Sequence, residues 1–209
     1  MTNIDIQQMN VGALGVNCYI VSNTETKEAV VVDPGGHAHA IADNLKKEGL
    51  TLAAIFLTHA HFDHADGAED LQKLTGAKIY ACNEEKRTLE DPRYNMSNMM
   101  GMGISYKADI YVVDGQVLDV AGLSFEVIHT PGHTEGGCCY YLKDQKLLLS
   151  GDTLFCTSIG RTDFPGGSYG TLLRSIKEKL FVLPEDVKVL PGHEGTTYIG
   201  YEKDHNPFL

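Results

Sequence analysis

The densest group of side chains with metal-binding chemistry follows one apolar segment. In TLAAIFLTHAHFDHADG the run LAAIFL (52–57) leads directly into His59, His61, Asp63 and His64. Residues two apart on an extended backbone point to the same side, so His59 and His61 can bind one ion together. If the chain then curls into a helix, Asp63 and His64 can face a second ion. The spacing therefore predicts a site for metal ions in a turn at the end of a strand.

Three later segments place a residue able to bind metal directly after an apolar run. His133 lies in HTPGHTEGG, Asp152 in LLLSGDTLF and His193 in VLPGHEGT. Glycine and proline beside these residues allow the backbone to bend around an ion. We expect all seven residues to bind metal. Because they offer nitrogen and oxygen without thiolate, they suit zinc and also iron or manganese, and we favour two zinc ions.

Apolar periodicity and turn residues indicate the elements that hold these side chains. Strands are expected near residues 4–6 and over 17–22, 29–33, 52–57, 77–81, 116–120, 123–129, 137–142, 146–150 and 187–190, and helices over 38–47, 68–74 and 172–180. Each half of the chain gives strands followed by helices. We therefore predict an α+β fold, an αββα sandwich in which two β-sheets pack face to face with helices on the outer faces. Residues 1–209 are expected to form a single domain without linkers.

Residues 88–107 interrupt this pattern. They contain Pro92, two glycines and four methionines, namely Met96, Met99, Met100 and Met102. The composition predicts an irregular flap. We expect the methionines to fill the core, and the alternative is a flexible apolar cover over a substrate cleft.

The overall charge and the cysteines restrict the class of protein. A net charge of −11 opposes sequence-independent binding to nucleic acid, which requires Lys and Arg to neutralise phosphates. The five cysteines form no CxxC pair, which is typical of reduced thiols. No leader with a basic and an apolar region begins the chain, and no segment is long and apolar enough for a membrane span. We expect a cytoplasmic protein that binds neither nucleic acid nor membrane, with its oligomeric state left open.

The segments VVDPGG, THAHFDH, TPGHTEG, SGDTLF and PGHE, in this order, resemble the motifs of the metallo-β-lactamase superfamily. The resemblance implies two sets of three ligands and one bridging carboxylate: His59, His61 and His133 for one ion, Asp63, His64 and His193 for the other, and Asp152 for both. It also implies that Asp33 hydrogen-bonds a ligand histidine and fixes its tautomer.

Two cations that share one water lower its pKa toward 7, so that hydroxide exists at neutral pH. We expect this bridging hydroxide to attack a polarised carbonyl, with Asp63 and Asp152 as catalytic residues and Asp63 accepting the released proton. GRTDFPGGS (160–168) and the tail GYEKDHNPFL resemble the short bacterial type of glyoxalase II-like hydrolase. That resemblance implies hydrolysis of hydroxyacylglutathione, a small-molecule thioester. The chain ends before the helical domain with which longer members bind glutathione, so the thiol carrier is left open.

Arg161 follows the Asp152 loop and is a candidate for binding a substrate carboxylate, because guanidinium pairs with such groups in a bidentate manner. An ion pair with Asp163 that shapes the loop is the alternative for this side chain.

Other functions stay open on the same motifs. A mononuclear iron persulfide dioxygenase shares the fold and a similar GRTDF run, and would use only His59, His133 and Asp152. A lactonase of this fold is a further alternative. A β-lactamase is disfavoured by the missing leader and by the absence of cysteine from the ligand set. A purely structural metal site is disfavoured because seven ligands for two ions leave coordination positions open.

Overall fold

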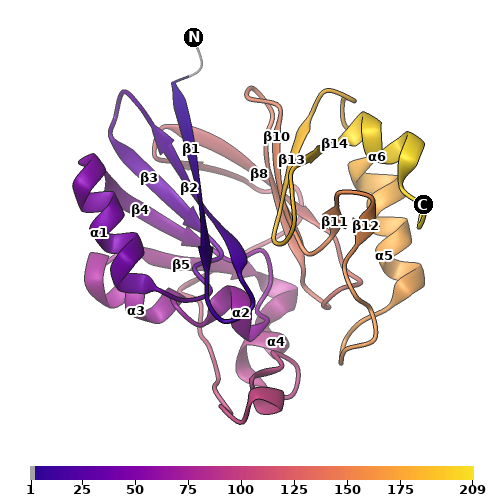
Figure 1. The fold of residues 1–209 in the computed structure, drawn as a ribbon, viewed down its shortest axis with the longest axis horizontal. Coiled ribbons are helices and arrows are strands. Elements are labelled where there is room, and N and C mark those ends of the chain that lie inside the picture. The colour runs from indigo at the N-terminus through magenta and orange to yellow at the C-terminus, as the bar shows by residue number, and fades with distance from the viewer. Residues whose placement is uncertain (1–2) are drawn as a thin grey trace.

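Two six-stranded sheets form the centre of the molecule, and helices cover the outer face of each (Figure 1). The computed structural model describes residues 3–209. In spatial order the first sheet contains β1 (Ile4–Val11), β2 (Val16–Asn23), β3 (Glu28–Val32), β4 (Thr51–Phe56), β5 (Lys78–Cys82) and β6 (Ile110–Val112). The second contains β14 (Thr197–Tyr198), β13 (Lys188–Pro191), β10 (Leu147–Gly151), β9 (Cys138–Leu142), β8 (Leu123–His129) and β7 (Val117–Val120). The predicted αββα sandwich is confirmed.

Strand β9 is apolar throughout, and β3 is apolar from Ala29 onward, because both faces of these segments are buried. Val30 of β3 packs between the two sheets, whereas Val31 packs under the helices of the first sheet. Tyr140 of β9 likewise faces the other sheet, and Tyr141 faces the helices of the second sheet. Three apolar layers therefore separate the four layers of secondary structure.

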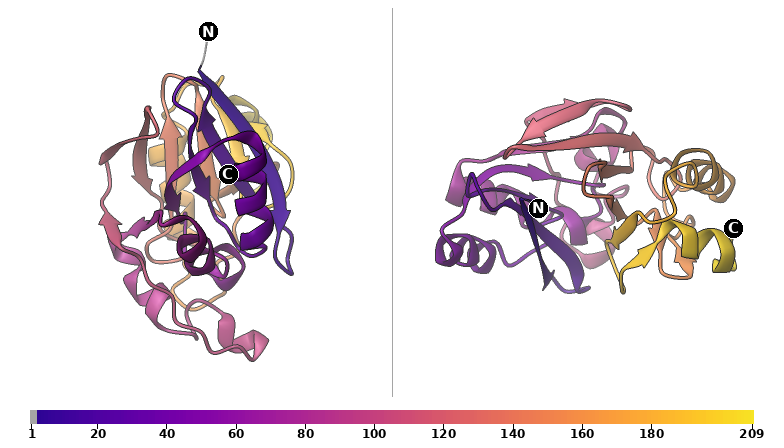
Figure 2. Two further views of the ribbon diagram at one scale, coloured as in Figure 1. Left: turned by 90° about the vertical axis from the view of Figure 1, so that its left-hand side faces the viewer. Right: turned by 90° about the horizontal axis from the view of Figure 1, so that it is seen from above.

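Four helices form the outer layers. The first sheet is covered by α1 (Ala38–Glu48) and α3 (Ala68–Thr75), and the second by α5 (Tyr169–Ser175) and α6 (Ile199–His205). Figure 2 shows these two groups on opposite flanks of the sandwich. The expected helix over 172–180 is α5 followed by a π-helical turn, Ile176–Leu180. Helix α1 stops at Gly49, whose φ of 68° is left-handed and suits glycine at a helix end.

The expected strands and helices all occur in the structure. The periodicity gave no prediction for β6, β14, α6, α4 (Lys86–Glu90) or the antiparallel pair β11 (Leu154–Phe155) and β12 (Ser158–Ile159). Most of these elements have too few residues to show a repeat of apolar positions.

The methionines of the 88–107 segment divide between two environments. Met96 is buried in the layer under α1 and α3, as expected for core filling. Met99 and Met100, in the short 3-10 helix η2 (Ser97–Met100), are 74% and 51% exposed. Met102 is also exposed, at 39%. Core filling was therefore the wrong expectation for these three residues. The segment is held in place by Asn95, which donates to the carbonyl of Ile104 and whose own carbonyl accepts from the amide of Phe62.

All five cysteines are free thiols, and four of them are buried, namely Cys18, Cys82, Cys138 and Cys139. This agrees with the expected absence of a disulfide framework. Among residues 3–209, none of the helices combines the length and apolar character that crossing a bilayer requires.

Candidate metal centre

The loop after β4 and the short helix α2 (Phe62–Ala65) carry four of the seven expected metal ligands. His59 lies in the loop, His61 precedes the first helical residue, and Asp63 and His64 lie in α2. The helix packs against the VVDPGG segment so closely that a Cβ on Gly35 would lie 1.4 Å from the carbonyl oxygen of Asp63. Only glycine fits there, so this motif serves to bring the helix close to the first sheet.

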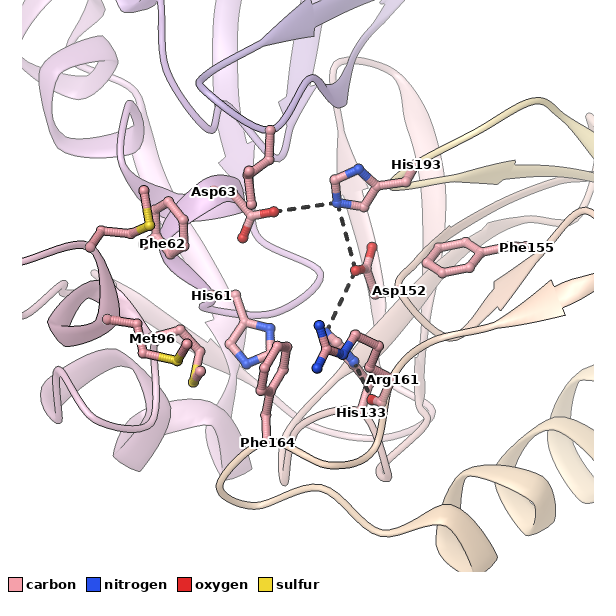
Figure 3. Close-up of a pocket in the computed structure, with 13 residues that line it drawn as sticks. His61, Phe62, Asp63, Met96, His133, Asp152, Phe155, Arg161, Phe164 and His193 are labelled. Atoms are coloured by element: carbon pink, nitrogen blue, oxygen red, sulfur yellow. Dashed lines mark hydrogen bonds and ion pairs between the residues drawn. The ribbon is translucent and has the colours of Figure 1, made fainter.

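The other three residues reach the same place from the second sheet. His133 follows β8, Asp152 follows β10 and His193 follows β13. Figure 3 shows His61 and Asp63 facing His133, Asp152 and His193 across one pocket. The structure therefore brings together all seven residues that the sequence singled out.

The side chains form two groups of three. The nitrogens of His59, His61 and His133 lie within 4.8 Å of one another, and so do ligand atoms of Asp63, His64 and His193. In the second group, Nε2 of His193 is 3.3 Å and Nε2 of His64 is 3.8 Å from Oδ2 of Asp63. Donor atoms at such separations can bind a single cation placed between them.

The Asp152 carboxylate lies between the two groups. Its Oδ2 is 3.6 Å from Nε2 of His133 and 3.8 Å from Nε2 of His193. Its Oδ1 is 3.4 Å from Nε2 of His64. One carboxylate thus faces histidines of both groups, which is the geometry required of a bridge.

Several buried polar atoms in these groups have no hydrogen-bond partner among the residues that the structure describes. They are Nε2 of His59, His61, His64 and His133, and Oδ1 of Asp152. An unpaired buried polar atom is costly, and each such atom in a folded protein requires an explanation. Within the described chain, every unpaired buried side-chain nitrogen or oxygen belongs to the expected ligand set. The residues present therefore fit bound cations.

Burial and charge set the protonation of the groups. Burial lowers the pKa of His59, His61 and His133 below the ordinary value, so these imidazoles are neutral and able to bind metal. Burial alone would raise the pKa of Asp152, but the charge and hydrogen bond of the neighbouring His64, together with the charges of His133 and His193, outweigh it and lower the pKa. Asp152 is therefore an anion at neutral pH.

Hydrogen bonds on the far side of the imidazoles fix their orientation. Nδ1 of His64 lies 2.9 Å from Oδ2 of Asp33, the acid in VVDPGG. The same carboxylate accepts from the amide and the hydroxyl of Thr58 at 2.8 and 2.6 Å. Nδ1 of His133 lies 2.7 Å from the backbone carbonyl of Arg161. When Nδ1 donates in these bonds, Nε2 of each histidine is left free to face the centre.

Glu85 is a buried acid near the site that the sequence analysis missed. Its Oε1 accepts from the amide of Ala60 at 2.9 Å, and its Oε2 accepts from the Thr134 hydroxyl at 2.9 Å and the Gly136 amide at 2.8 Å. Burial raises the pKa of Glu85 to about 7. Because Ala60 lies between His59 and His61, and Thr134 follows His133, one carboxylate holds together the two loops that form the first group.

Asn17 of β2 performs a similar role for the second group, and it was also missed. Its side-chain amide donates to the carbonyls of Pro191 and Glu194 at 3.0 and 2.9 Å, and its backbone amide donates to Gly192 at 2.8 Å. These bonds attach the loop that carries His193 to the first sheet.

A pocket of about 330 Å³ opens onto the metal-binding groups. Arg161 lines it, but its guanidinium donates to both carboxylate oxygens of Asp163, at 3.0 and 2.8 Å, and lies 4.2 Å from the ring centre of Phe164. The structure thus contains the ion pair that was the alternative for this residue. Contact between Arg161 and a substrate carboxylate stays a prediction.

Residues 11–193 match the family model described as the metallo-beta-lactamase superfamily. The chain belongs to the metallo-β-lactamase superfamily. The match covers Asp33 and the whole expected ligand set, from His59 to His193, and confirms the resemblance that the motifs indicated.

Known members of the superfamily resemble the chain along nearly its full length. Hydroxyacylglutathione hydrolase GloC of Haemophilus influenzae is 35% identical over 99% of this chain and 98% of its own. The solved structure of BLEG-1, described as a B3 metallo-beta-lactamase, is 42% identical with a TM-score of 0.92, covering 98% of this chain and 99% of that one. The structure of TTHA1623 in a di-iron-bound form is 32% identical with a TM-score of 0.86, covering 97% and 100%. With such neighbours and the two His and Asp groups, the chain is a metal-binding hydrolase of this superfamily.

Proposed function

We propose that the chain is a binuclear metal-dependent hydrolase that cleaves thioesters of the hydroxyacylglutathione type. The observation that carries the proposal is the position of Asp152, whose two carboxylate oxygens face histidines of both ligand groups at 3.4 to 3.8 Å. A carboxylate in that position can hold two cations side by side. The identity to GloC over nearly the whole of both chains supports a thioester as the substrate.

In this proposal His59, His61 and His133 hold one ion, Asp63, His64 and His193 hold the other, and Asp152 holds both. Divalent cations bound there supply Lewis acidity and an activated water at neutral pH. Asp63 lines the pocket, and although burial opposes its ionisation, the charge of His64 lowers its pKa, so it is ionised and able to accept a proton. Asp33 and the carbonyl of Arg161 keep His64 and His133 oriented.

The two complete groups support this function over the mononuclear dioxygenase raised by the sequence. That reaction would use His59, His133 and Asp152 alone and would leave Asp63, His64 and His193 without a role. Oxygen consumption with a persulfide substrate distinguishes the two functions, because a hydrolase consumes none. A lactonase breaks a carbonyl carbon–oxygen bond where a thioesterase breaks a carbonyl carbon–sulfur bond, and both reactions begin with attack on the carbonyl. Lactones therefore belong in the same substrate panel.

Zinc remains our choice of metal, with iron as the alternative supported by the di-iron form of TTHA1623. Histidine and carboxylate ligands accept either ion. Metal analysis of the purified protein, followed by activity after reconstitution with each ion, tests this part of the proposal.

Hydrolysis of β-lactams is a second candidate, favoured by the 42% identity to BLEG-1. An amide carbonyl in a strained ring needs the same polarisation and the same nucleophile as a thioester.

The deciding experiment is a turnover screen of protein with known metal content against S-lactoylglutathione, glutathione persulfide, a homoserine lactone and a β-lactam. We expect the thioester to give the highest kcat/KM and chelation to abolish turnover while the protein stays folded. A higher kcat/KM for the β-lactam would establish the second candidate in its place. If the metal-loaded protein hydrolyses none of these substrates, the proposed function is wrong.

A further inference from the structure

The walls of the active-site pocket divide sharply by chemistry. Its polar residues are Arg161 and five members of the ligand set, His61, Asp63, His133, Asp152 and His193. All its other lining residues are apolar: Phe62, Met96, Phe155 and Phe164 in the interior, and Leu14, Met99 and Met100 toward the mouth. Apart from Arg161, the walls that a substrate meets away from the metal-binding groups therefore present carbon and sulfur.

The apolar residues of the mouth are also exposed to water. Leu14 is 54%, Met99 is 74% and Met100 is 51% exposed. They come from the β1–β2 turn and from η2, two segments distant in sequence that meet at one opening. Clustered apolar surface of this kind indicates a surface that is covered during function, and here it continues into the reactive centre. When an apolar group of a ligand covers this surface, hydrocarbon that is exposed to water in the free protein becomes buried. This burial favours binding.

The pocket offers little to an anionic substrate arm. Arg161 is the one Lys or Arg among the lining residues within the described chain, and its guanidinium is already paired with Asp163 at 2.8 Å. Glutathione carries two carboxylates and an ammonium group. A direct ion pair between Arg161 and such an arm would require Arg161 to leave Asp163, and the rest of the arm would place charge against the apolar side chains of Phe62, Met96 and Phe164.

Figure 3 shows the consequence for the shape of the site. Phe62 and Met96 lie on one side of His61, Phe164 lies beside it, and Phe155 lies beyond Asp152 and His193. The reactive centre is thus flanked by aromatic rings and thioethers, which suit aliphatic and aromatic groups.

We propose that the preferred substrates are thioesters with an uncharged, apolar arm, bound between η2, the β1–β2 turn and Phe164, and that glutathione thioesters are secondary substrates. This inference depends on the proposed function, because it assumes that a thioester carbonyl is the reacting group.

A matched set of thioesters tests the inference. Three substrates share the lactoyl group and differ in the thiol, which is glutathione, N-acetylcysteamine or benzyl mercaptan. A fourth substrate, the phenylacetyl thioester of N-acetylcysteamine, places the apolar arm on the acyl side. Each kcat/KM is divided by the hydroxide-catalysed rate of the same thioester, which removes differences in intrinsic reactivity. We expect at least one of the two aromatic thioesters to exceed S-lactoylglutathione by about tenfold or more, as burial of one apolar side chain predicts. A normalised kcat/KM highest for S-lactoylglutathione would overturn the inference and leave the thioesterase function intact.

Variants of the flap connect this preference to named residues. In Met99→Gln/Met100→Gln the side chains keep their length but become polar, and both positions are already exposed, so the fold is not at risk. The quantity compared is the kcat/KM of the better aromatic thioester divided by that of the lactoyl thioester of N-acetylcysteamine. We expect this ratio to fall about tenfold in the double variant. The matched control is Met102→Gln, which lies on the same segment at 39% exposure and does not line the pocket. An unchanged ratio in the double variant, or an equal change in Met102→Gln, would contradict the proposed contact.

A binding measurement separates failure of the inference from failure of the function. The unreactive thioether N-acetyl-S-benzylcysteamine is titrated calorimetrically into metal-free protein, with N-acetyl-S-methylcysteamine as the control. We expect tighter binding of the benzyl compound with a negative heat-capacity change, the mark of apolar burial. Equal binding of the two compounds would refute the apolar pocket even if the enzyme hydrolyses thioesters. If no thioester is hydrolysed but the benzyl compound binds, the proposed function is wrong and the apolar pocket stands.

Discussion

Oδ2 of Asp33 lies 2.9 Å from Nδ1 of His64, and both side chains are almost completely buried. The contact joins the end of β3 to helix α2, so a residue of the first sheet orients an imidazole that faces the metal site. Asp33 has a φ of 52°, a left-handed conformation that Asp and Asn tolerate better than most residues.

Replacing Asp33 by Asn should weaken the second metal site without disturbing the backbone. Asn retains the shape and the left-handed conformation but loses the negative charge that favours the Nδ1–H tautomer of His64. We expect the second ion to bind about tenfold to hundredfold more weakly, as measured by competition with a chromophoric chelator. Asp43→Asn, in the solvent-facing part of α1, is the control. Two ions bound with parental affinity in Asp33→Asn would show that the contact has no role in binding metal.

His61→Ala removes one nitrogen of the first group and opens space in the pocket. We expect kcat/KM for the best thioester to fall at least about a thousandfold, because polarisation by a bound ion contributes several kcal/mol to such reactions. His39→Ala, at an exposed position of α1, should retain parental activity. Comparable rates for His61→Ala and the parent would count against the assignment of this centre as the active site.

Metal removal should lower the stability of the whole domain. The unpaired nitrogens of the site have no partner within the described chain, and a cation that binds only the folded state stabilises it by mass action. We expect zinc in hundredfold excess over its Kd to raise the Tm of chelator-treated protein by about 5 to 10 °C. Magnesium, which prefers oxygen ligands, serves as the control and should shift the Tm much less. A Tm that does not respond to zinc, iron or manganese would be inconsistent with a metal centre.

Glu85 should give the stability a measurable pH dependence. Its pKa is raised from an ordinary 4.5 to about 7 by burial. The folded state therefore binds this proton more tightly than the unfolded chain does, and the resulting stability is present in full below about pH 4.5 and is lost as the pH rises through 7. The shift corresponds to about 3 kcal/mol in the free energy of unfolding.

The variant Glu85→Gln is neutral at every pH and isolates this contribution. Relative to the parent it should be more destabilised at pH 5 than at pH 8, with a difference that approaches about 3 kcal/mol in metal-free protein unfolded by urea. Glu90→Gln, on the exposed side of α4, is the control. A destabilisation of Glu85→Gln that is the same at both pH values would mean that Glu85 is ionised in the folded protein throughout.

The meeting of the seven candidate ligands could be predicted from the sequence because each of these residues is marked by its immediate neighbours. His59 to His64 follow an apolar strand in a dense pattern, and His133, Asp152 and His193 each follow a strand and sit beside glycine or proline. Strand ends lie together at the edge of a sheet. Local sequence patterns were therefore sufficient to predict that side chains far apart in the sequence lie close together in space.

The residues that support the ligands could not be found in this way. Glu85 lies in NEEKR, where nothing distinguishes it from exposed acids, and its burial follows only from the packing of the Ala60 and Thr134 loops around it. Asn17 is likewise defined by a hydrogen bond to Pro191, 174 residues away. For Met99 and Met100, composition indicated an apolar role, but only the fold shows that they line a pocket mouth.

Neither half of the chain contains all the residues of either proposed ligand group. His59 and His61 come from the first sheet and need His133 from the second, and Asp63 and His64 similarly need His193. A nascent polypeptide therefore lacks the last residue of the second group until residue 193 has been synthesised. With metal bound as proposed, a protein whose two halves are not docked would be unable to hold either ion.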